Sequence, residues 1–254
     1  MKFIKPSTFL LLSCLVVFSS CDPDVEDLKG GVDLAFHSSY GNSYLVVDTP
    51  YSYGEYDVMF SELNFIFTEL KLTPKSGNVI TLQSSGIIDF SDLNTIEKAT
   101  EGIVLDFSDL PAGEYTSIQF DVGLGDNYVG TSPADYSTSD VLGDSYNYWP
   151  GWQNYIITRL EARFDSDADG QFTDESFQYH LGGDEAYRTI VLDNNFQILP
   201  GGRTTIDLNI DWREVLTLND ERIDPAVYSN THTSAEEWLI VHLLDNMEQE
   251  IIIE

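Results

Sequence analysis

Short segments in which apolar and polar residues alternate recur along most of this chain. The clearest lie at residues 32–37, 115–122 and 205–212, and further strands are expected at residues 44–47, 63–72, 103–107, 156–164 and 188–192. Because the side chains of a β-strand point alternately to its two faces, each segment can bury one face and expose the other. Turns rich in proline and glycine separate these segments. The pattern predicts an all-β fold, an antiparallel β-sandwich of the Ig-like or Greek-key type with long loops.

Helix is expected mainly near the C-terminus. Ser234 and Glu237 form a capping box, in which each side chain bonds a backbone N–H of the first helical turn. This motif predicts a short C-terminal helix over residues 235–247, and residues 251–253 would follow it as a strand. No internal repeat or linker divides the chain, so we expect residues 32–254 to form a single domain.

The first twenty residues have the pattern of a signal peptide. Lys2 and Lys5 supply a basic start, and residues 9–18 form an apolar run. That run is shorter than the roughly 20 apolar residues that a membrane-spanning helix needs. Small residues stand directly before Cys21, as in a lipobox. We therefore expect removal of residues 1–20, lipidation of Cys21 and an acidic tether at residues 21–31; a cleaved signal without lipid is the alternative.

This processing also decides the cysteine chemistry. The chain has 2 cysteines, of which Cys14 would leave with the signal peptide and Cys21 would carry the lipid. The domain would then have no thiol and no disulfide, which excludes thiolate metal sites. The expected location is the cell envelope, where the lipid anchors the protein to the outer membrane, on its periplasmic or its surface side.

The charge of the chain limits its partners. With 43 acidic residues against 12 Lys and Arg, the formal net charge is -31. Nucleic acid and anionic lipid surfaces would be repelled, whereas cations would be attracted. We therefore expect no nucleic-acid partner, and membrane contact only through the lipid anchor.

Residues 165–176 form an acidic segment with carboxylates at alternate positions. The expected calcium ligands are Asp165, Asp167, Asp169, Gln171 through its carbonyl, Asp174 and Glu175. Gly170 allows the sharp turn that such a loop requires. Ser176 stands where an EF-hand would place its bidentate glutamate, and strands rather than helices flank the loop. The hypothesis is a calcium loop of another type than the EF-hand; the alternative is a solvated acidic hairpin.

The chain has 4 histidines. His37 and His180 are out of phase with the apolar residues of their strands, which indicates outward-facing positions, and His232 lies in a loop ahead of the predicted helix. We take these three as candidate metal ligands, with ordinary surface histidines as the alternative. His242 lies among apolar residues and is expected to be a hydrogen-bonded helix histidine. Imidazole ligands without thiolates favour copper or zinc.

Two tryptophans, Trp149 and Trp152, flank a Pro-Gly turn in an aromatic-rich segment. Aromatic side chains in such a turn form a packed lid or, more rarely, an exposed platform for a sugar or a peptide. Motifs for nucleophilic catalysis, for a zinc protease and for phosphate binding are missing from the sequence. We therefore do not expect an enzyme.

Taken in order, these motifs resemble the MbnP-like family of copper-associated periplasmic proteins and lipoproteins. The matching segments are residues 34–37, 63–72, 110–123, 148–155, 177–183 and 231–233. The resemblance implies a β-sandwich that binds copper, with His37 and His180 as ligands. It also implies that a dihaem enzyme related to MauG oxidises a tryptophan, Trp149 or else Trp152.

We therefore expect a copper-binding lipoprotein outside the cytoplasm. The competing hypothesis is a surface adhesion or glycan-binding module. Histidines that converge in the fold would favour the first, and exposed tryptophan rings lying side by side would favour the second.

Overall fold

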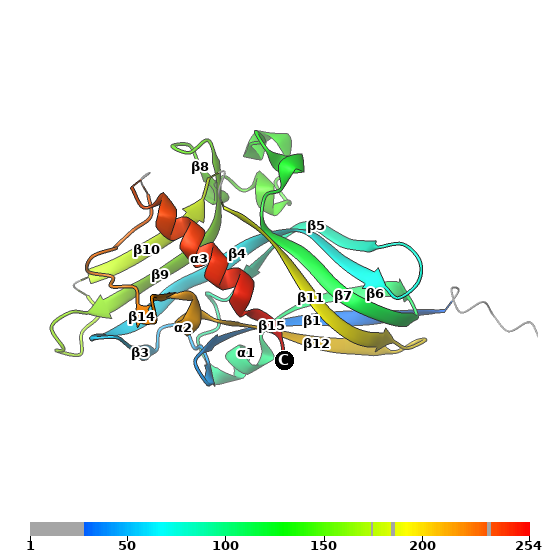
Figure 1. The fold of residues 1–254 in the computed structure, drawn as a ribbon, viewed down its shortest axis with the longest axis horizontal. Coiled ribbons are helices and arrows are strands. Elements are labelled where there is room, and N and C mark those ends of the chain that lie inside the picture. Colours follow the sequence, from blue (N-terminus) through cyan, green and yellow to red (C-terminus); the bar gives the residue numbers. More distant parts are fainter. Residues whose placement is uncertain (1–27, 174, 184–185, 233–234) are drawn as a thin grey trace, which may run out of the picture.

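The computed structural model describes residues 28–173, 175–183, 186–232 and 235–254. Within them the chain forms two β-sheets that enclose a common core, with short helices around them (Figure 1). The expected lipidation site Cys21, the tether up to residue 27, the calcium candidate Asp174 and the helix cap Ser234 lie outside the described residues. The predicted all-β sandwich is confirmed.

The first sheet contains the strands β1 (Lys29–Tyr40), β2 (Ser43–Tyr44), β6 (Ile103–Pro111), β12 (Arg203–Asp211) and β15 (Ile251–Ile253). β1 lies between β12 and β6, and β12 also pairs with β15. β1 begins at Lys29, so it includes residues 29–31, which we expected to belong to the tether. β1 and β12 run parallel, which departs from the predicted antiparallel arrangement, while β6 and β15 are antiparallel to their neighbours.

The second sheet contains the strands β3 (Pro50–Tyr53), β4 (Tyr56–Pro74), β5 (Ile80–Asp89), β7 (Gly113–Gly123), β8 (Tyr148–Trp149), β9 (Asn154–Asp165), β10 (Glu175–Gly182) and β11 (Tyr187–Ile198). The main order is β10-β9-β4-β7-β11. β4 is 19 residues long, so its first half pairs with β3 and β9 and its second half with β5 and β7. A separate ribbon joins β13 (Thr217–Leu218) to β14 (Glu221–Arg222).

The core lies between the two sheets. Phe36 of β1 meets Phe65 of β4 and Phe120 of β7, with ring centroids 6.3 and 5.8 Å away. All three rings are buried, and full burial of such a side chain contributes roughly 1.5–3 kcal/mol. The alternation in the sequence therefore has a direct cause: one face of each sheet forms this apolar layer.

In the described residues three α-helices pack around the sheets: α1 (Ile96–Glu101), α2 (Trp212–Val215) and α3 (Glu237–Glu250). α3 starts two residues after the predicted helix and ends three residues later, and the predicted closing strand is β15. His242 is the hydrogen-bonded helix histidine that we expected, with its Nε2 2.7 Å from the carbonyl of Thr217. None of the helices in the described part of the chain is long and apolar enough to cross a membrane.

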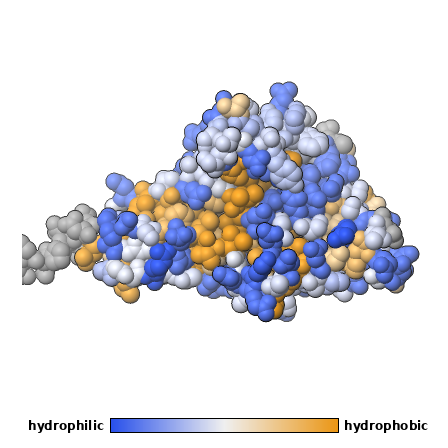
Figure 2. Space-filling view, turned by 180° about the vertical axis from the view of Figure 1, so that it is seen from behind, coloured by the Kyte–Doolittle hydropathy of each residue, from blue (hydrophilic) through white to orange (hydrophobic). Residues whose placement is uncertain are grey.

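A band of apolar side chains is visible on the face opposite to that of Figure 1 (Figure 2). β5 and β6 border the two sheets, and their apolar side chains pack on the core while staying partly exposed. These residues are Ile80, Leu82, Ile87, Ile103, Leu105 and Phe107. The apolar layer of the sandwich thus reaches the surface along these two strands.

Candidate metal centre

β10 and the segment after residue 228 bring two histidines together. His180 alternates with the buried Tyr179 and Leu181, so its side chain projects from the outer face of the eight-stranded sheet. Residues 229–232 add to the edge of β10: the backbone N–H of Gln178 donates to Ser229 O at 2.8 Å, and the hydroxyl of Thr231 donates to His180 O at 2.7 Å. This docking places His232 beside His180.

The two imidazole rings face each other through their nitrogens. His180 Nδ1 lies 3.1 Å from His232 Nε2, and the ring centroids are 4.8 Å apart. On its other side, His180 Nε2 lies 2.7 Å from Glu161 Oε1 on the neighbouring strand β9. The His180 side chain is only 12% exposed. His180 is thus shielded from water, and both of its ring nitrogens are hydrogen-bonded.

The separation of the two nitrogens fits a shared metal ion. Imidazole nitrogens bind zinc at about 2.0–2.1 Å, so His180 Nδ1 and His232 Nε2, which lie 3.1 Å apart, are close enough to hold one ion together. Two neutral imidazoles without a thiolate are ligands for copper or zinc rather than for a hard cation.

Burial and hydrogen bonds alter the acid–base properties of this centre. Burial lowers the pKa of His232, and the neighbouring His180 lowers it further. The hydrogen bond with His180 holds the pKa of Glu161 below its ordinary value. Glu161 is therefore a carboxylate at neutral pH, and His232 favours the neutral form that a metal ligand requires.

Trp149 covers the histidine pair from one side. Its ring stacks on His232, with centroids 5.6 Å apart and an interplanar angle of 26°, and it is 37% exposed. Trp152 lies 6.0 Å from Trp149 at 50°. A Cβ atom on Gly182 would come within 2.5 Å of the Trp152 ring, so the glycine after the histidine motif makes room for that indole. Trp149 therefore borders the histidine pair, and Trp152 lies beside Trp149 and Gly182.

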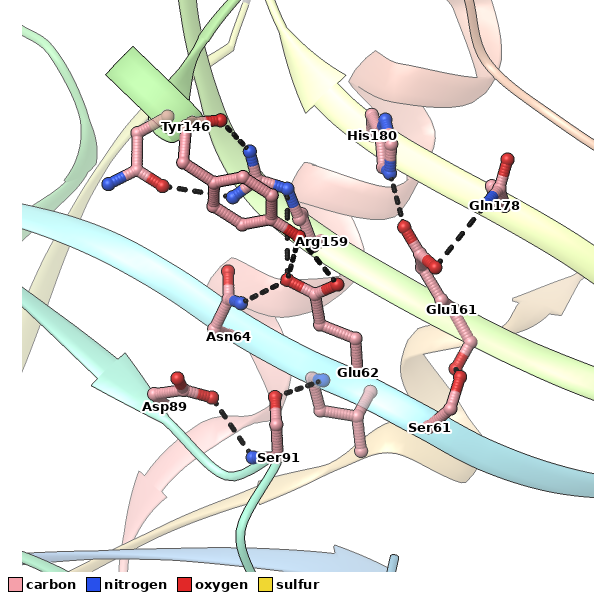
Figure 3. A network of polar contacts seen from close by, with 12 residues as sticks. Ser61, Glu62, Asn64, Asp89, Ser91, Tyr146, Arg159, Glu161, Gln178 and His180 are labelled. Carbon is pink, nitrogen blue, oxygen red and sulfur yellow. Dashed lines mark hydrogen bonds and ion pairs between the residues drawn. The ribbon is translucent and has the colours of Figure 1, made fainter. Parts of the chain in front are cut away.

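A buried arginine anchors the segment that leads into Trp149 (Figure 3). Arg159 donates from Nη1 to Asn147 Oδ1 at 2.9 Å and from Nη2 to the carbonyl of Tyr146, and its guanidinium lies 4.0 Å from the centre of the Tyr146 ring. Arg159 Nε is 3.7 Å from Glu62 Oε1. Arg159 thus holds residues 146 and 147 on the sheet, just ahead of Trp149.

His37, the third candidate, lies elsewhere. It projects from the outer face of the five-stranded sheet, where its Nε2 is 3.1 Å from Asp207 Oδ1 and its ring is 5.4 Å from that of Tyr44. The core separates this face from that of His180, so the structure does not bring His37 to the pair. The expected surface position is also incorrect: His37 is 5% exposed, because Gly102 at the end of α1 covers its ring.

The acidic loop gathers its first three carboxylates. Oxygen atoms of Asp165, Asp167 and Asp169 lie within 4.8 Å of one another. Backbone N–H groups also turn toward them: Gly170 donates to Asp165 Oδ2 at 2.8 Å, and Gln171 donates to Asp169 Oδ1 at 2.7 Å. The hydrogen bond from Gly170 lowers the pKa of Asp165, and those from the backbone N–H groups of residues 167–169 lower it further. Glu175 instead accepts a hydrogen bond from the hydroxyl of Ser166, at 3.2 Å.

The fold and the histidine pair define a β-sandwich protein with a candidate centre for a transition metal. The chain belongs to the MbnP family, whose model matches residues 29–234. Among solved structures it is similar to "MbnP from Methylosinus trichosporium", with 14% sequence identity, a TM-score of 0.53 and 80% of each chain covered. At that identity the likeness shows the fold alone. No curated protein matches the chain.

Proposed function

We propose that this protein is a copper-binding lipoprotein outside the cytoplasm, in which His180 and His232 hold the metal. The observation that carries the proposal is the convergence of their ring nitrogens at 3.1 Å in a shielded position. Membership of the MbnP family supports copper rather than zinc. The role is binding and handling of the metal rather than catalysis, with Cys21 as the lipid anchor in the cell envelope.

The proposal includes an oxidised tryptophan. Trp149 is the first candidate because it is partly exposed to a partner and stacks on His232, so a modified ring would stay beside the metal. Trp152, which packs against Gly182, is the second. The proposed oxidising partner is a dihaem enzyme related to MauG.

Metal analysis and intact mass of protein purified from its native envelope test this function. We expect copper to accompany the protein, the mass to include a lipid, and a mass gain on the peptide that contains Trp149. The matched sample is a His180→Ala/His232→Ala variant purified in the same way, which should carry no copper. Equal copper in both samples would exclude the histidine pair as the site.

A glycan-binding or adhesion function is the competing proposal, and the exposed rings of Tyr146 and Trp149 are what favours it. The tilted arrangement of Trp149 and Trp152 and the stacking of Trp149 on a histidine count against a flat sugar platform. Binding on a glycan array that is lost in a Trp149→Ala variant would support this function over copper handling.

We also propose that the acidic loop binds calcium. Two carboxylates about 4 Å apart repel each other by about 1 kcal/mol even in bulk water, and a cation converts that repulsion into ligation. Calcium should therefore raise the melting temperature by mass action. Magnesium at equal ionic strength controls for general screening of the negative charge. If both ions act equally, or if Asp167→Ala leaves the calcium response unchanged, the loop is a solvated hairpin.

A further inference from the structure

We propose that Glu161 is a positioning residue that fixes the ring of His180 in the form that binds metal through Nδ1, and that it favours copper(II) over copper(I) in this centre. The inference rests on the proposed copper function and assigns a role to a residue of β9 whose carboxylate bonds His180 and Gln178. Figure 3 shows Glu161 between these two side chains.

The strands place Glu161 for this contact. β9 and β10 are antiparallel, with Glu161 opposite Gln178 and Arg159 opposite His180. All four side chains project from the outer face of the sheet, because the residues between them on both strands are buried. Glu161 reaches diagonally to His180 Nε2 at 2.7 Å, and its second oxygen accepts from Gln178 Nε2 at 3.3 Å. Both carboxylate oxygens are therefore engaged.

The chemistry of the pair determines where the proton lies. A carboxylate only accepts hydrogen bonds, so His180 must carry its N–H on Nε2, and a neutral ring then has its lone pair on Nδ1. That lone pair faces His232 Nε2 at 3.1 Å. In the metal-free protein His232 donates this hydrogen bond. Binding of a metal by both rings would then require only that His232 move its proton from Nε2 to Nδ1, so its ring stays neutral while His180 keeps its proton on Nε2.

The carboxylate also acts on the metal through the ring. A hydrogen bond from a ligating histidine to a carboxylate raises the basicity of the ligand, and such partners change metal affinity by about 10–100-fold. The neighbouring cation, Arg159, is engaged by Glu62, Asn147 and Tyr146 on the other side. The more basic nitrogen and the nearby negative charge both stabilise the divalent ion more than the monovalent one.

The first test uses the metal-free protein and ¹⁵N NMR of its imidazoles. In the native chain we expect His180 to carry its proton on Nε2. Glu161→Gln retains an oxygen acceptor of the same shape and should retain this form, whereas Glu161→Ala should show a mixture of both forms. A proton on Nδ1 of His180 in the native protein would overturn the inference, whether or not the protein binds copper.

The second test measures the affinities for copper(I) and copper(II) and the reduction potential. We expect Glu161→Ala to bind copper(II) about 10–100-fold more weakly, and Glu161→Gln to show a raised potential, since it keeps the hydrogen bond and loses the charge. Glu114→Gln, an exposed acid paired with Lys75, controls for the loss of one charge. If the native protein binds copper and both Glu161 variants match it in affinity and potential, the inference is wrong while the proposed function stands.

Discussion

Replacement of His180 by alanine is expected to lower the affinity for copper by more than about 100-fold, since loss of a ligand exceeds the 10–100-fold effect of an outer-shell partner. His37→Ala, in contrast, should leave the affinity nearly unchanged. The reason is geometric. His180 Nδ1 lies next to His232 Nε2, where one metal ion can bind both, whereas His37 is hydrogen-bonded to Asp207 on the outer face of the other sheet. Competition with chromophoric chelators measures both oxidation states.

The same experiment separates the ligand set of the family resemblance from the one that the fold supports. The resemblance assigns His37 and His180, while the structure joins His180 to His232. His242→Gln is the matched control, because His242 bonds the carbonyl of Thr217 and glutamine can also donate there. Equal losses in the His37→Ala and His180→Ala variants would show that the described arrangement is not the one that binds copper.

Replacement of Arg159 by methionine is expected to lower the free energy of unfolding by about 3–5 kcal/mol, the usual cost of removing one partner of a buried ion pair. The Arg159 side chain is 3% exposed, and its loss leaves Glu62, Asn147 and the Tyr146 carbonyl without their bonds to it. Because these bonds hold the segment before Trp149, copper affinity should also fall. Urea denaturation followed by circular dichroism measures the stability change.

Arg163→Met is the control that the chain offers for this variant. Arg163 lies on the same strand and face, but its side chain is 44% exposed and is paired with the exposed Asp48 at 3.4 Å. Such surface pairs contribute about 0–1 kcal/mol. A similar loss of stability in both variants would mean that Arg159 supports the sheet in general and has no specific anchoring role.

The fold class could be predicted from the sequence because local alternation and burial coincide in strands such as residues 115–122, which form most of β7. The parallel pairing of β1 with β12, in contrast, could not be predicted from the sequence. The two strands are about 170 residues apart in register, and each alternates in the same way as the antiparallel strands. Alternation determines which face of a strand is buried but not which strand it joins, nor in which direction.

The candidate site was predictable only in part. His180 was found because it is out of phase with Tyr179 and Leu181, but the same argument placed His37 at the surface, since sequence cannot show that α1 covers an outer face. The position of His232 depends on residues 229–232 docking on β10, a tertiary contact. In the sequence, Glu161 and Arg159 look like ordinary charged residues on the outer face of β9. Their roles depend on side chains of other segments, which the sequence alone does not place beside them.

The position of β1 determines how the domain responds to a pull on the chain before it. β1 is the first described strand, and it pairs through residues 31–39 with β12 and through residues 29–36 with β6. Hydrogen bonds between strands run across the strand direction. A force along β1 therefore acts in shear on its hydrogen bonds to β12 and to β6 at the same time, so these bonds cannot break one after another. A pull on the chain upstream of Lys29 is therefore resisted by the hydrogen bonds on both sides of β1.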